Sequence, residues 1–330
     1  FGHYQFLSVG VVIHLRYRAV KNFHKDSFFR LGFEYLCATI LGKMENILIT
    51  GADGQLGSEL RGLTQGESGT NWLYTDIHEL DITDAAAVED YISAHGVTRI
   101  INCAAYNAVD QAETDTDAAI RLNVTGPMNL AEAAARHGIY LIHISTDFVF
   151  DGTKTSPYHE SDRPAPLSEY GRTKLAGEIA VKRSGCLSII IRTSWLYSPL
   201  GKKNFVRTML RLGEEEEIIK VVYDQKGSPT YARDLAEAIL HILPQLDAVP
   251  RYGEVFHYAD EGCCTKAEFA QKIITLKHLD CDIEPVPTSE FPAPARRPAY
   301  SVLDKSLIKT VFGVKVPLWE RSLSKAVRLF

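Results

Sequence analysis

The sequence lacks several features that would place it in other classes of protein. No stretch of its 330 residues reaches the roughly 18 consecutive apolar residues that a membrane-spanning helix needs. Lys and Arg number 36 against 41 Asp and Glu, so the formal charge is −5 and the positive excess typical of a nucleic-acid-binding module is missing. Apolar residues make up 45% and charged residues 23%, which excludes a disordered chain. We therefore expect a globular protein with neither a membrane nor a nucleic acid as partner.

The six cysteines also lack the spacing of a metal site or a disulfide framework. No C-x-x-C pair occurs, and Cys103 and Cys186 lie inside apolar runs. Reduced, packed thiols in a cytoplasmic protein fit this pattern better than disulfides or a zinc site. The adjacent Cys263 and Cys264 leave a redox-active pair open as the less favoured alternative, because low-pKa thiols need electropositive surroundings.

The first 43 residues differ from the remainder. They contain six Lys and Arg, two Asp and Glu, nine of the 32 aromatic residues and no methionine. The first methionine is Met44, and a strand-like run begins at Asn46. We interpret residues 1–43 as a non-native or upstream extension that takes no part in the fold, with a targeting peptide as the alternative.

From Met44 onward, short apolar runs alternate with stretches of helical periodicity. Strands are predicted at 46–50, 71–75, 99–104, 139–145 and 188–192, and helices at 84–94, 118–137 and 168–183. Such alternation predicts an α/β fold, a Rossmann-like doubly wound parallel sheet covered on both faces. Glycines and prolines interrupt the pattern after Ser194. We predict a dinucleotide-binding domain at 44–194 and a smaller, mainly substrate-binding lobe at 195–330, with some segments returning to the sheet.

A glycine-rich turn follows the first predicted strand and opens a helix. Residues 51–57 read Gly-Ala-Asp-Gly-Gln-Leu-Gly. Glycines let the backbone approach a pyrophosphate, and a helix N-terminus offers free N–H groups to it. We predict that Gly51, Gly54 and Gly57 form a phosphate cradle, with an ordinary turn as the alternative.

An aspartate ends the second predicted strand. Asp76 lies 19 residues after Gly57, where a carboxylate would accept hydrogen bonds from a ribose hydroxyl. The same charge would repel a 2′-phosphate, which favours NADH over NADPH. A turn-capping role is the alternative.

Tyr170 and Lys174 form a Y-x-x-x-K pair on a predicted helix, and Thr146 lies 24 residues upstream at the end of a strand. Positions i and i+4 share a helix face, so the ammonium can lie near the phenol and lower its pKa. A phenol so activated could protonate a carbonyl oxygen as hydride arrives, while the threonine hydroxyl holds that oxygen. A second Y-x-x-x-K, Tyr17 to Lys21, has no such context.

These motifs resemble those of the dTDP-4-dehydrorhamnose reductase family, within the extended short-chain dehydrogenases. The matching segments are 49–57, 102–110, 145–152, 170–178, 192–197, 204–206, 224–230 and 295–298. The resemblance covers nearly the whole chain after Met44. Asn107 departs from it, since threonine is more usual there, and residues 1–43 have no counterpart.

The resemblance implies reduction of the 4-keto group of dTDP-6-deoxy-L-lyxo-4-hexulose to dTDP-L-rhamnose by NADPH or NADH. It implies catalysis by Thr146, Tyr170 and Lys174, and contacts of Asp147 and Trp195 with the sugar. The cofactor contacts that it implies, besides those of Tyr170 and Lys174, are Gln55, Leu56, Asp76, Asp81, Ile82, Ala104, Ala105 and Tyr106.

Some assignments stay open at this point. Arg297, which precedes a proline, could bind a substrate phosphate bidentately or lie on the surface. Trp195 could cover a sugar face or pack in the core. Family members bind Mg²⁺ between subunits in some cases and tend to dimerise, which leaves a metal and a homodimer open. The alternative functions are another nucleotide-sugar epimerase or dehydratase, or a regulatory subunit of methionine adenosyltransferase.

Overall fold

The fold is a parallel sheet of six strands. The computed structural model describes residues 44–330, so the expectations for residues 1–43 and for Tyr17 and Lys21 lie outside the described part. The strands run in the order β10-β5-β4-β3-β1-β2, and all neighbours are parallel. Their bounds are β1 (Glu45–Thr50), β2 (Thr70–Thr75), β3 (Arg99–Asn102), β4 (Tyr140–Thr146), β5 (Ser188–Thr193) and β10 (Tyr252–His257). The predicted doubly wound parallel sheet is confirmed.

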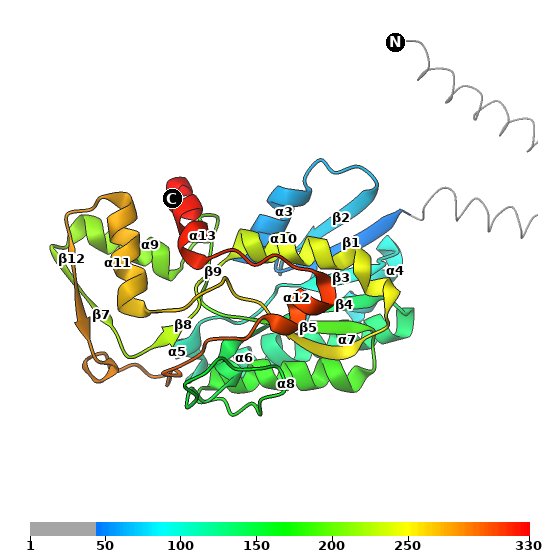
Figure 1. Ribbon diagram of the computed structural model, residues 1–330. Helices are drawn as coiled ribbons and strands as arrows, with labels where there is room; N and C mark the ends of the chain where they lie inside the picture. The colour runs from blue at the N-terminus through cyan, green and yellow to red at the C-terminus, as the bar shows by residue number, and fades with distance from the viewer. Residues whose placement is uncertain (1–43) are drawn as a thin grey trace, which may run out of the picture. The chain divides into compact units, whose positions relative to one another are not determined.

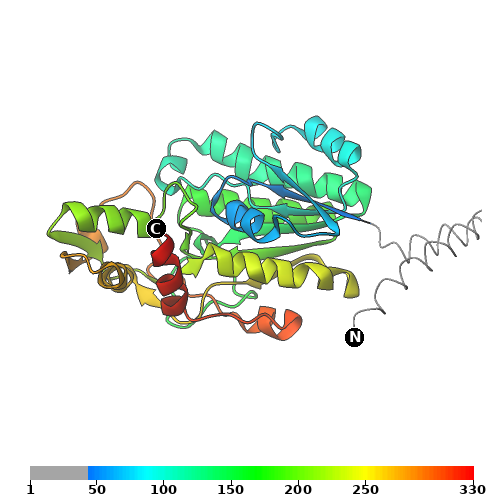
Figure 2. The ribbon, with the colours of Figure 1, turned by 90° about the horizontal axis from the view of Figure 1, so that it is seen from above.

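Helices cover both faces of this sheet (Figures 1 and 2). One face carries α4 (Ala85–His95), α7 (Gly126–His137) and α8 (Glu169–Ser184), and the other carries α3 (Gln55–Thr64), α10 (Ala232–Ile242) and α12 (Ser306–Phe312). Successive residues of β1 show why both faces are apolar: Ile47 and Ile49 pack into one core, whereas Leu48 packs into the other.

The sheet changes direction at β1. From β1 the chain passes to the edge strand β2 and then returns to β3 on the other side of β1. The carboxyl ends of β1 and β3 lie on either side of this switch point, where ligands bind in open α/β sheets. Gly51 follows β1 with a φ of 66°, and a Cβ there would lie 2.6 Å from the backbone nitrogen of Ala104. Any side chain at position 51 would therefore collide with the loop after β3.

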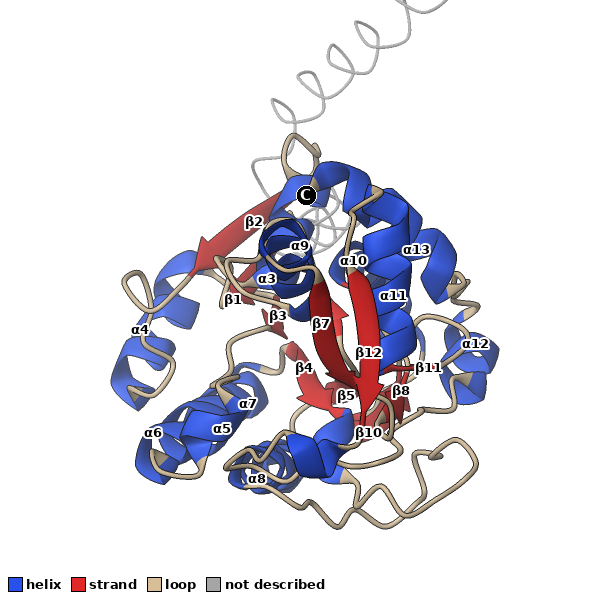
Figure 3. Ribbon diagram, turned by 90° about the vertical axis from the view of Figure 1, so that its left-hand side faces the viewer, coloured by secondary structure: helices blue, strands red, loops and turns tan. Residues whose placement is uncertain are grey.

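A second region packs around its own core (Figure 3). It contains a parallel pair of strands, β7 (Ile218–Val222) and β12 (Asp282–Val286), with α9 (Phe205–Glu215), α11 (Lys266–Lys277) and α13 (Trp319–Ala326). Two pairs of two-residue strands complete it: β6 (Leu196–Tyr197) with β9 (Thr230–Tyr231), and β8 (Lys226–Gly227) with β11 (Cys264–Thr265). Phe269 of α11 joins this core by stacking on Phe205 and meeting Trp319 edge to face.

The predicted helix 118–137 is interrupted in the structure. α6 (Thr116–Ile120) runs into a π-helical turn, η1 (Arg121–Thr125), before α7 begins. The wider turn carries Asn123, whose amide binds both the backbone N–H and the carbonyl of Tyr106 and also reaches Thr173. This polar clamp on the loop after β3 accounts for the local change of helix type, which side-chain periodicity does not reveal.

One further expectation was wrong at its boundary. The third strand ends at Asn102, because its side chain accepts a hydrogen bond from the Ala104 N–H and turns the chain away from the sheet. From residues 195–330, β10 returns to the main sheet as its sixth strand, in line with the expectation that some segments of this half return. α10, which the sequence did not predict, packs on the same sheet beside α3.

No helix of residues 44–330 is both long and apolar enough to cross a bilayer.

Candidate active site

A cavity of about 400 Å³ lies at the carboxyl ends of the central strands. It gathers the following predicted site residues: Gly51, Gly54, Gln55, Leu56, Ala105, Thr146, Asp147, Tyr170, Lys174, Trp195 and Arg297. The remaining predicted residues do not line it: Gly57, Asp76, Asp81, Ile82, Ala104 and Tyr106. The predicted cradle and the predicted catalytic residues therefore share one cavity.

The glycine turn leads directly into α3. Gly54 stands at the start of this helix, and no side chain caps its first N–H groups, which remain free to bind an anion. Gly57 lies against the turn itself: a Cβ at this position would be 2.4 Å from the Gly51 carbonyl oxygen. These features fit a dinucleotide pyrophosphate, because the backbone carries no side chain at the glycines where the phosphates would approach.

The Gln55 side chain joins this turn to the second region. Its carbonyl oxygen accepts hydrogen bonds from the Ser198 N–H and the Asn204 amide, both at 2.9 Å. Its amide donates to the Leu196 carbonyl at 3.3 Å. The residue predicted to line the cofactor thus also holds residues 196–204 against α3.

Asp76 lies at the end of β2, as predicted. Its two carboxylate oxygens accept hydrogen bonds from the backbone N–H groups of Asp53, at 3.1 Å, and Ile77, at 2.9 Å. The negative charge is therefore held beside the glycine turn, where the ribose of a dinucleotide would lie.

Three further predicted site residues, Asp81, Ile82 and Tyr106, lie outside the cavity and have other contacts. Asp81 accepts hydrogen bonds from the backbone N–H and the hydroxyl of Thr83. Ile82 is buried against Gly126, and a Cβ added to Gly126 would lie 2.5 Å from the Ile82 side chain. Tyr106 donates from its hydroxyl to Asp115 at 3.2 Å. In the described structure these three side chains serve turns and packing.

Thr146 and Tyr170 meet at the centre of the cavity. Thr146 ends β4, and Tyr170 lies in the first turn of α8, packed edge to face on Phe148 with ring centroids 5.6 Å apart. Burial raises the pKa of Tyr170 to about 12, a hydrogen bond with Thr146 opposes this rise, and the nearby Asp147 carboxylate adds to it. The phenol is therefore fully protonated at neutral pH and available as a proton donor.

Lys174 is buried in the same cavity but does not act as expected on the phenol. Its ammonium donates to the Ile144 carbonyl at 2.7 Å, and burial lowers its pKa to about 8. The expected lowering of the Tyr170 pKa by Lys174 is not seen in this structure, because the ammonium is directed to the backbone of β4.

The start of α8 is fixed by a cap and a close contact. The Ser168 hydroxyl accepts a hydrogen bond from the Gly171 N–H at 3.2 Å. A Cβ on Gly171 would lie 2.3 Å from the Phe148 carbonyl oxygen, so the helix can approach the loop after β4 only with glycine there. This approach places Tyr170 beside Thr146.

A buried ion pair ties the middle of α8 to the sheet. Glu178 accepts hydrogen bonds from Arg192 of β5 at 2.8 and 2.6 Å and from the Ser145 hydroxyl of β4 at 2.6 Å. Glu178 and Arg192 are 1% and 2% exposed. One carboxylate thus holds the helix of Tyr170 against the strand that carries Thr146.

Asp147 is a buried carboxylate next to Thr146. It accepts a hydrogen bond from the Thr146 hydroxyl at 3.1 Å, and its second oxygen has no partner within residues 44–330. Burial raises its pKa to about 6, while the hydrogen bond from Thr146, the nearby Ser301 hydroxyl and the positive charge of Lys266 oppose this rise. An unpartnered oxygen in the cavity wall is available to a ligand hydroxyl.

Trp195 has an unusual backbone conformation. Its φ is 44°, a left-handed value that costs a bulky residue energy and is often found at functional sites. One face of its indole is covered by the Lys266 ammonium, 3.4 Å from the ring centroid, and its edge lies against Gly227, where a Cβ would be 2.5 Å away. The indole thus forms part of the cavity wall and also packs against the core of the second region.

Lys266, Gln225 and Ser301 line the cavity although sequence reasoning missed them. The one available signal was the Thr265-x-x-Glu268 capping box, which marks the start of α11 and places Lys266 in its first turn. Nothing in the sequence indicates that this turn faces Trp195.

Arg297 lines the cavity, but its guanidinium is already engaged. It pairs with Asp110 at 2.6 Å and donates to the Ala295 carbonyl at 3.0 Å. The pair holds the pKa of Asp110 below its usual range. The Arg297 side chain is 28% exposed and tied to Asp110, which favours neither of the two alternatives given for it.

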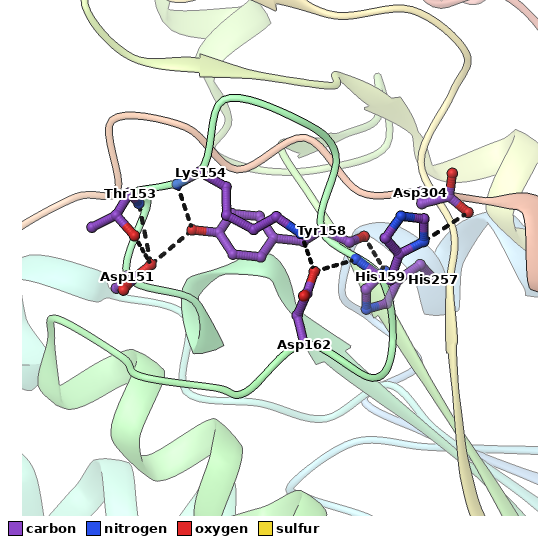
Figure 4. Close-up of polar contacts among 8 residues, drawn as sticks. All are labelled: Asp151, Thr153, Lys154, Tyr158, His159, Asp162, His257 and Asp304. Carbon is purple, nitrogen blue, oxygen red and sulfur yellow. Dashed lines mark hydrogen bonds and ion pairs between the residues drawn. The ribbon is translucent and has the colours of Figure 1, made fainter.

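The loop between β4 and α8 is fastened to the segment after Pro298 (Figure 4). The Tyr158 hydroxyl donates to Asp151 at 2.7 Å, and Tyr158 exchanges backbone hydrogen bonds with Val302 and Asp304, each at 2.8 Å. Asp162 accepts from Lys154 at 2.5 Å. The loop that separates Thr146 from Tyr170 in the sequence is therefore rigidly held.

Within residues 44–330 no three His, Cys, Asp or Glu side chains come together to hold a metal ion, so these residues give no support to the Mg²⁺ left open above. The five cysteines of the same residues are free thiols. Burial raises the pKa of Cys264, which speaks against the redox-active pair.

Comparison with known proteins points to one family. The family model described as RmlD substrate binding domain matches residues 44–330. The chain is 40% identical over 295 residues to the dTDP-4-dehydrorhamnose reductase of Aggregatibacter actinomycetemcomitans, covering 87% of this chain and 99% of the relative. It is 44% identical over 293 residues to that of Mycobacterium tuberculosis, covering 87% and 93%.

Solved structures agree with this assignment. The dTDP-4-dehydrorhamnose reductase of Clostridium acetobutylicum superposes with a TM-score of 0.81 at 41% identity, over 86% of this chain and 99% of the other. The enzyme of Bacillus anthracis, solved in complex with NADP, has a TM-score of 0.81 at 38% identity, over 87% and 100%. A dTDP-glucose 4,6-dehydratase of Streptomyces venezuelae, at 18% identity and a TM-score of 0.71, shares the fold alone. The chain belongs to the dTDP-4-dehydrorhamnose reductase family.

Proposed function

We propose that this protein reduces the 4-keto group of dTDP-6-deoxy-L-lyxo-4-hexulose to give dTDP-L-rhamnose, with NADH or NADPH as the reductant. The observation that carries the proposal is the shared cavity, in which a bare glycine turn and helix start lie together with Thr146, Tyr170 and Lys174. Residues 44–194 would then hold the cofactor, and residues 195–330 would contribute most of the substrate site.

A nicotinamide cofactor held in this cavity would supply the hydride for carbon 4 of the sugar. The Tyr170 hydroxyl donates its proton to the carbonyl oxygen as negative charge develops there, and solvent later restores that proton. An alkoxide is a stronger base than a phenolate, so this transfer is favourable even from a phenol whose pKa is raised to about 12. The Thr146 hydroxyl orients the carbonyl oxygen, and the buried Lys174 ammonium adds positive charge to the site.

Two side chains are placed to orient the sugar. The unpartnered oxygen of Asp147 can accept a hydrogen bond from a sugar hydroxyl. The Trp195 indole offers an apolar surface for the sugar ring. Both lie beside Thr146 and Tyr170, so they would hold carbon 4 near the proton donor.

The test is oxidation of NADH or NADPH in the presence of the 4-keto sugar nucleotide, followed by identification of the deoxysugar product. We expect cofactor oxidation that depends on the sugar nucleotide and stops in Tyr170→Phe. Elimination of water or epimerisation without net cofactor oxidation would favour the epimerase or dehydratase alternative. Tight binding to a methionine adenosyltransferase without any turnover would favour the regulatory alternative.

We also propose that the carboxylate of Asp76 makes NADH the better reductant. Its negative charge is held beside the glycine turn and would repel a 2′-phosphate. Asp76→Ser removes the charge, so the ratio of kcat/KM for NADPH to that for NADH should rise. A ratio unchanged from that of the native protein would contradict this role.

A further inference from the structure

The cavity beside Trp195 continues into a second, larger one. This second cavity, of about 740 Å³, is lined by Phe205 and Phe291 among others. Gln225, Lys266 and Arg297 line both cavities and so mark the junction between them. A ligand with its sugar at Tyr170 and its nucleoside in the second cavity must place the group that connects them at this junction.

The Lys266 ammonium is the cation at this junction that has no anionic partner. Within residues 44–330 it makes neither an ion pair nor a hydrogen bond, and it rests on the Trp195 and Phe205 rings, 3.4 and 4.8 Å from their centroids. The other cations nearby are committed, since Lys174 donates to a backbone carbonyl and Arg297 pairs with Asp110. An unpaired ammonium between two cavities is a ready site for an anion.

The backbone at Lys266 is fixed although its side chain is unpaired. Its N–H donates to the Gln225 carbonyl at 3.2 Å, and the capping box formed by Thr265 and Glu268 sets the start of α11 around it. The ammonium therefore projects from a rigid helix start, and the anion would not have to order a loop on binding.

We propose that Lys266 binds the diphosphate of the nucleotide-sugar substrate and so determines affinity for this class of ligand. The inference rests on the proposed function and deepens it. In the free protein the ammonium rests on the Trp195 indole. When the diphosphate draws it away, the indole face that it covered becomes available to the sugar, so binding of the two parts of the ligand is coupled.

The surroundings of Lys266 make this contact dependent on pH. Burial lowers its pKa to about 7, and the groups that face it are Asp147 and Cys264, which favour the ammonium, and Arg297, which opposes it. Because only the ammonium attracts the diphosphate, affinity should be full below pH 7 and should fall as the pH rises from 7 to 9.

The experiment measures binding of dTDP-glucose, a sugar nucleotide whose diphosphate keeps its charge over this pH range, by titration calorimetry of the full-length protein. Lys266→Met should weaken binding by about 10- to 100-fold at pH 7, the usual worth of a charge-assisted hydrogen bond. Lys266→Arg should keep most of the affinity and abolish its fall between pH 7 and 9, because the guanidinium stays charged. Lys272→Met, the same substitution farther along α11 and outside both cavities, should change nothing.

Several outcomes would overturn the proposal. Unchanged dTDP-glucose affinity in Lys266→Met would show that the ammonium does not contact the diphosphate. Equal losses in the Met and Arg variants, or a matching loss of NADPH affinity and thermal stability, would show a structural or cofactor role. If the native protein binds dTDP-glucose in a Lys266-dependent way but does not reduce the 4-keto sugar nucleotide, the diphosphate site is supported and the proposed reaction fails.

Discussion

The two halves of the described chain hold their site residues in different ways. In residues 44–194 the side chains follow the ends of parallel strands or the first turns of helices, so the register of the sheet sets where they lie. In residues 195–330 the corresponding side chains are Trp195 and Arg297, which come from loops, and Lys266, which comes from the first turn of α11; they are positioned by contacts with one another or with the first half. The comparison suggests that the reaction depends on the regular half and the choice of ligand on the irregular half.

Polar contacts join the two halves at defined points. Gln55 binds residues 196–204, and Arg297 pairs with Asp110. Loss of a contact within the regular half should therefore reduce turnover or overall stability, whereas loss of one in the irregular half should act first on substrate affinity. The following substitutions test the statement about residues 44–194, and the Lys266 substitutions described above test the one about residues 195–330.

The largest effect is expected for Tyr170→Phe. Removal of the proton donor should lower kcat by about 10²–10⁴-fold, the usual contribution of general acid catalysis. The affinity for NADH or NADPH should remain, because the glycine turn is untouched. Stopped-flow measurement of cofactor oxidation with a separate binding titration checks both, and full turnover in this variant would remove Tyr170 from the mechanism.

A comparable loss, but of stability, is expected for Glu178→Gln. The substitution leaves the buried Arg192 guanidinium without its carboxylate, which should lower the free energy of unfolding by about 3–5 kcal/mol. Chemical denaturation followed by circular dichroism measures this. Exchange for Gln of the partly exposed Glu89, which pairs with Arg136 and His137 at the surface, is the control and should cost less. Equal effects of the two substitutions would contradict the anchoring role of Glu178.

The smallest effect is expected for Tyr158→Phe in the loop shown in Figure 4. The hydroxyl donates a hydrogen bond to Asp151 and accepts one from the Lys154 N–H, and the loss of each should cost about 0.5–1.5 kcal/mol of stability. The backbone hydrogen bonds of Tyr158 persist in this variant, so kcat should stay close to that of the native protein. A large fall in kcat would show that the loop positions Tyr170 through this hydroxyl.

Some parts of the fold and the site were predictable because local rules determine them. The glycine turn after β1 requires a positive φ and leaves no space for a Cβ, so its glycines are visible in the sequence. Tyr170 and Lys174 lie on one helix at a spacing that puts them on one face, and both do line the cavity. The strand that ends at Thr146 was predicted because its apolar run is buried on both sides.

Other features could not be predicted because they depend on distant partners. The π-helical turn carries Asn123, which accepts a hydrogen bond from the backbone N–H of the distant Tyr106. β10 pairs with β5 only after the chain has run through part of the second region. The direction of the Lys174 ammonium, toward the Ile144 carbonyl, was equally hidden. Periodicity reports which face of an element is apolar and not which distant element meets it.

The amino-acid order alone determined the alternation of strands and helices, the bare turn for a phosphate and the tyrosine–lysine spacing, since each of these depends on neighbours within one or two turns of chain. Only the tertiary structure decided that Lys266 lies on Trp195, that Arg297 is taken by Asp110 and that two cavities meet between them. These contacts join residues far apart in the sequence, and their geometry is set by how the two cores pack, which no local pattern of residues encodes.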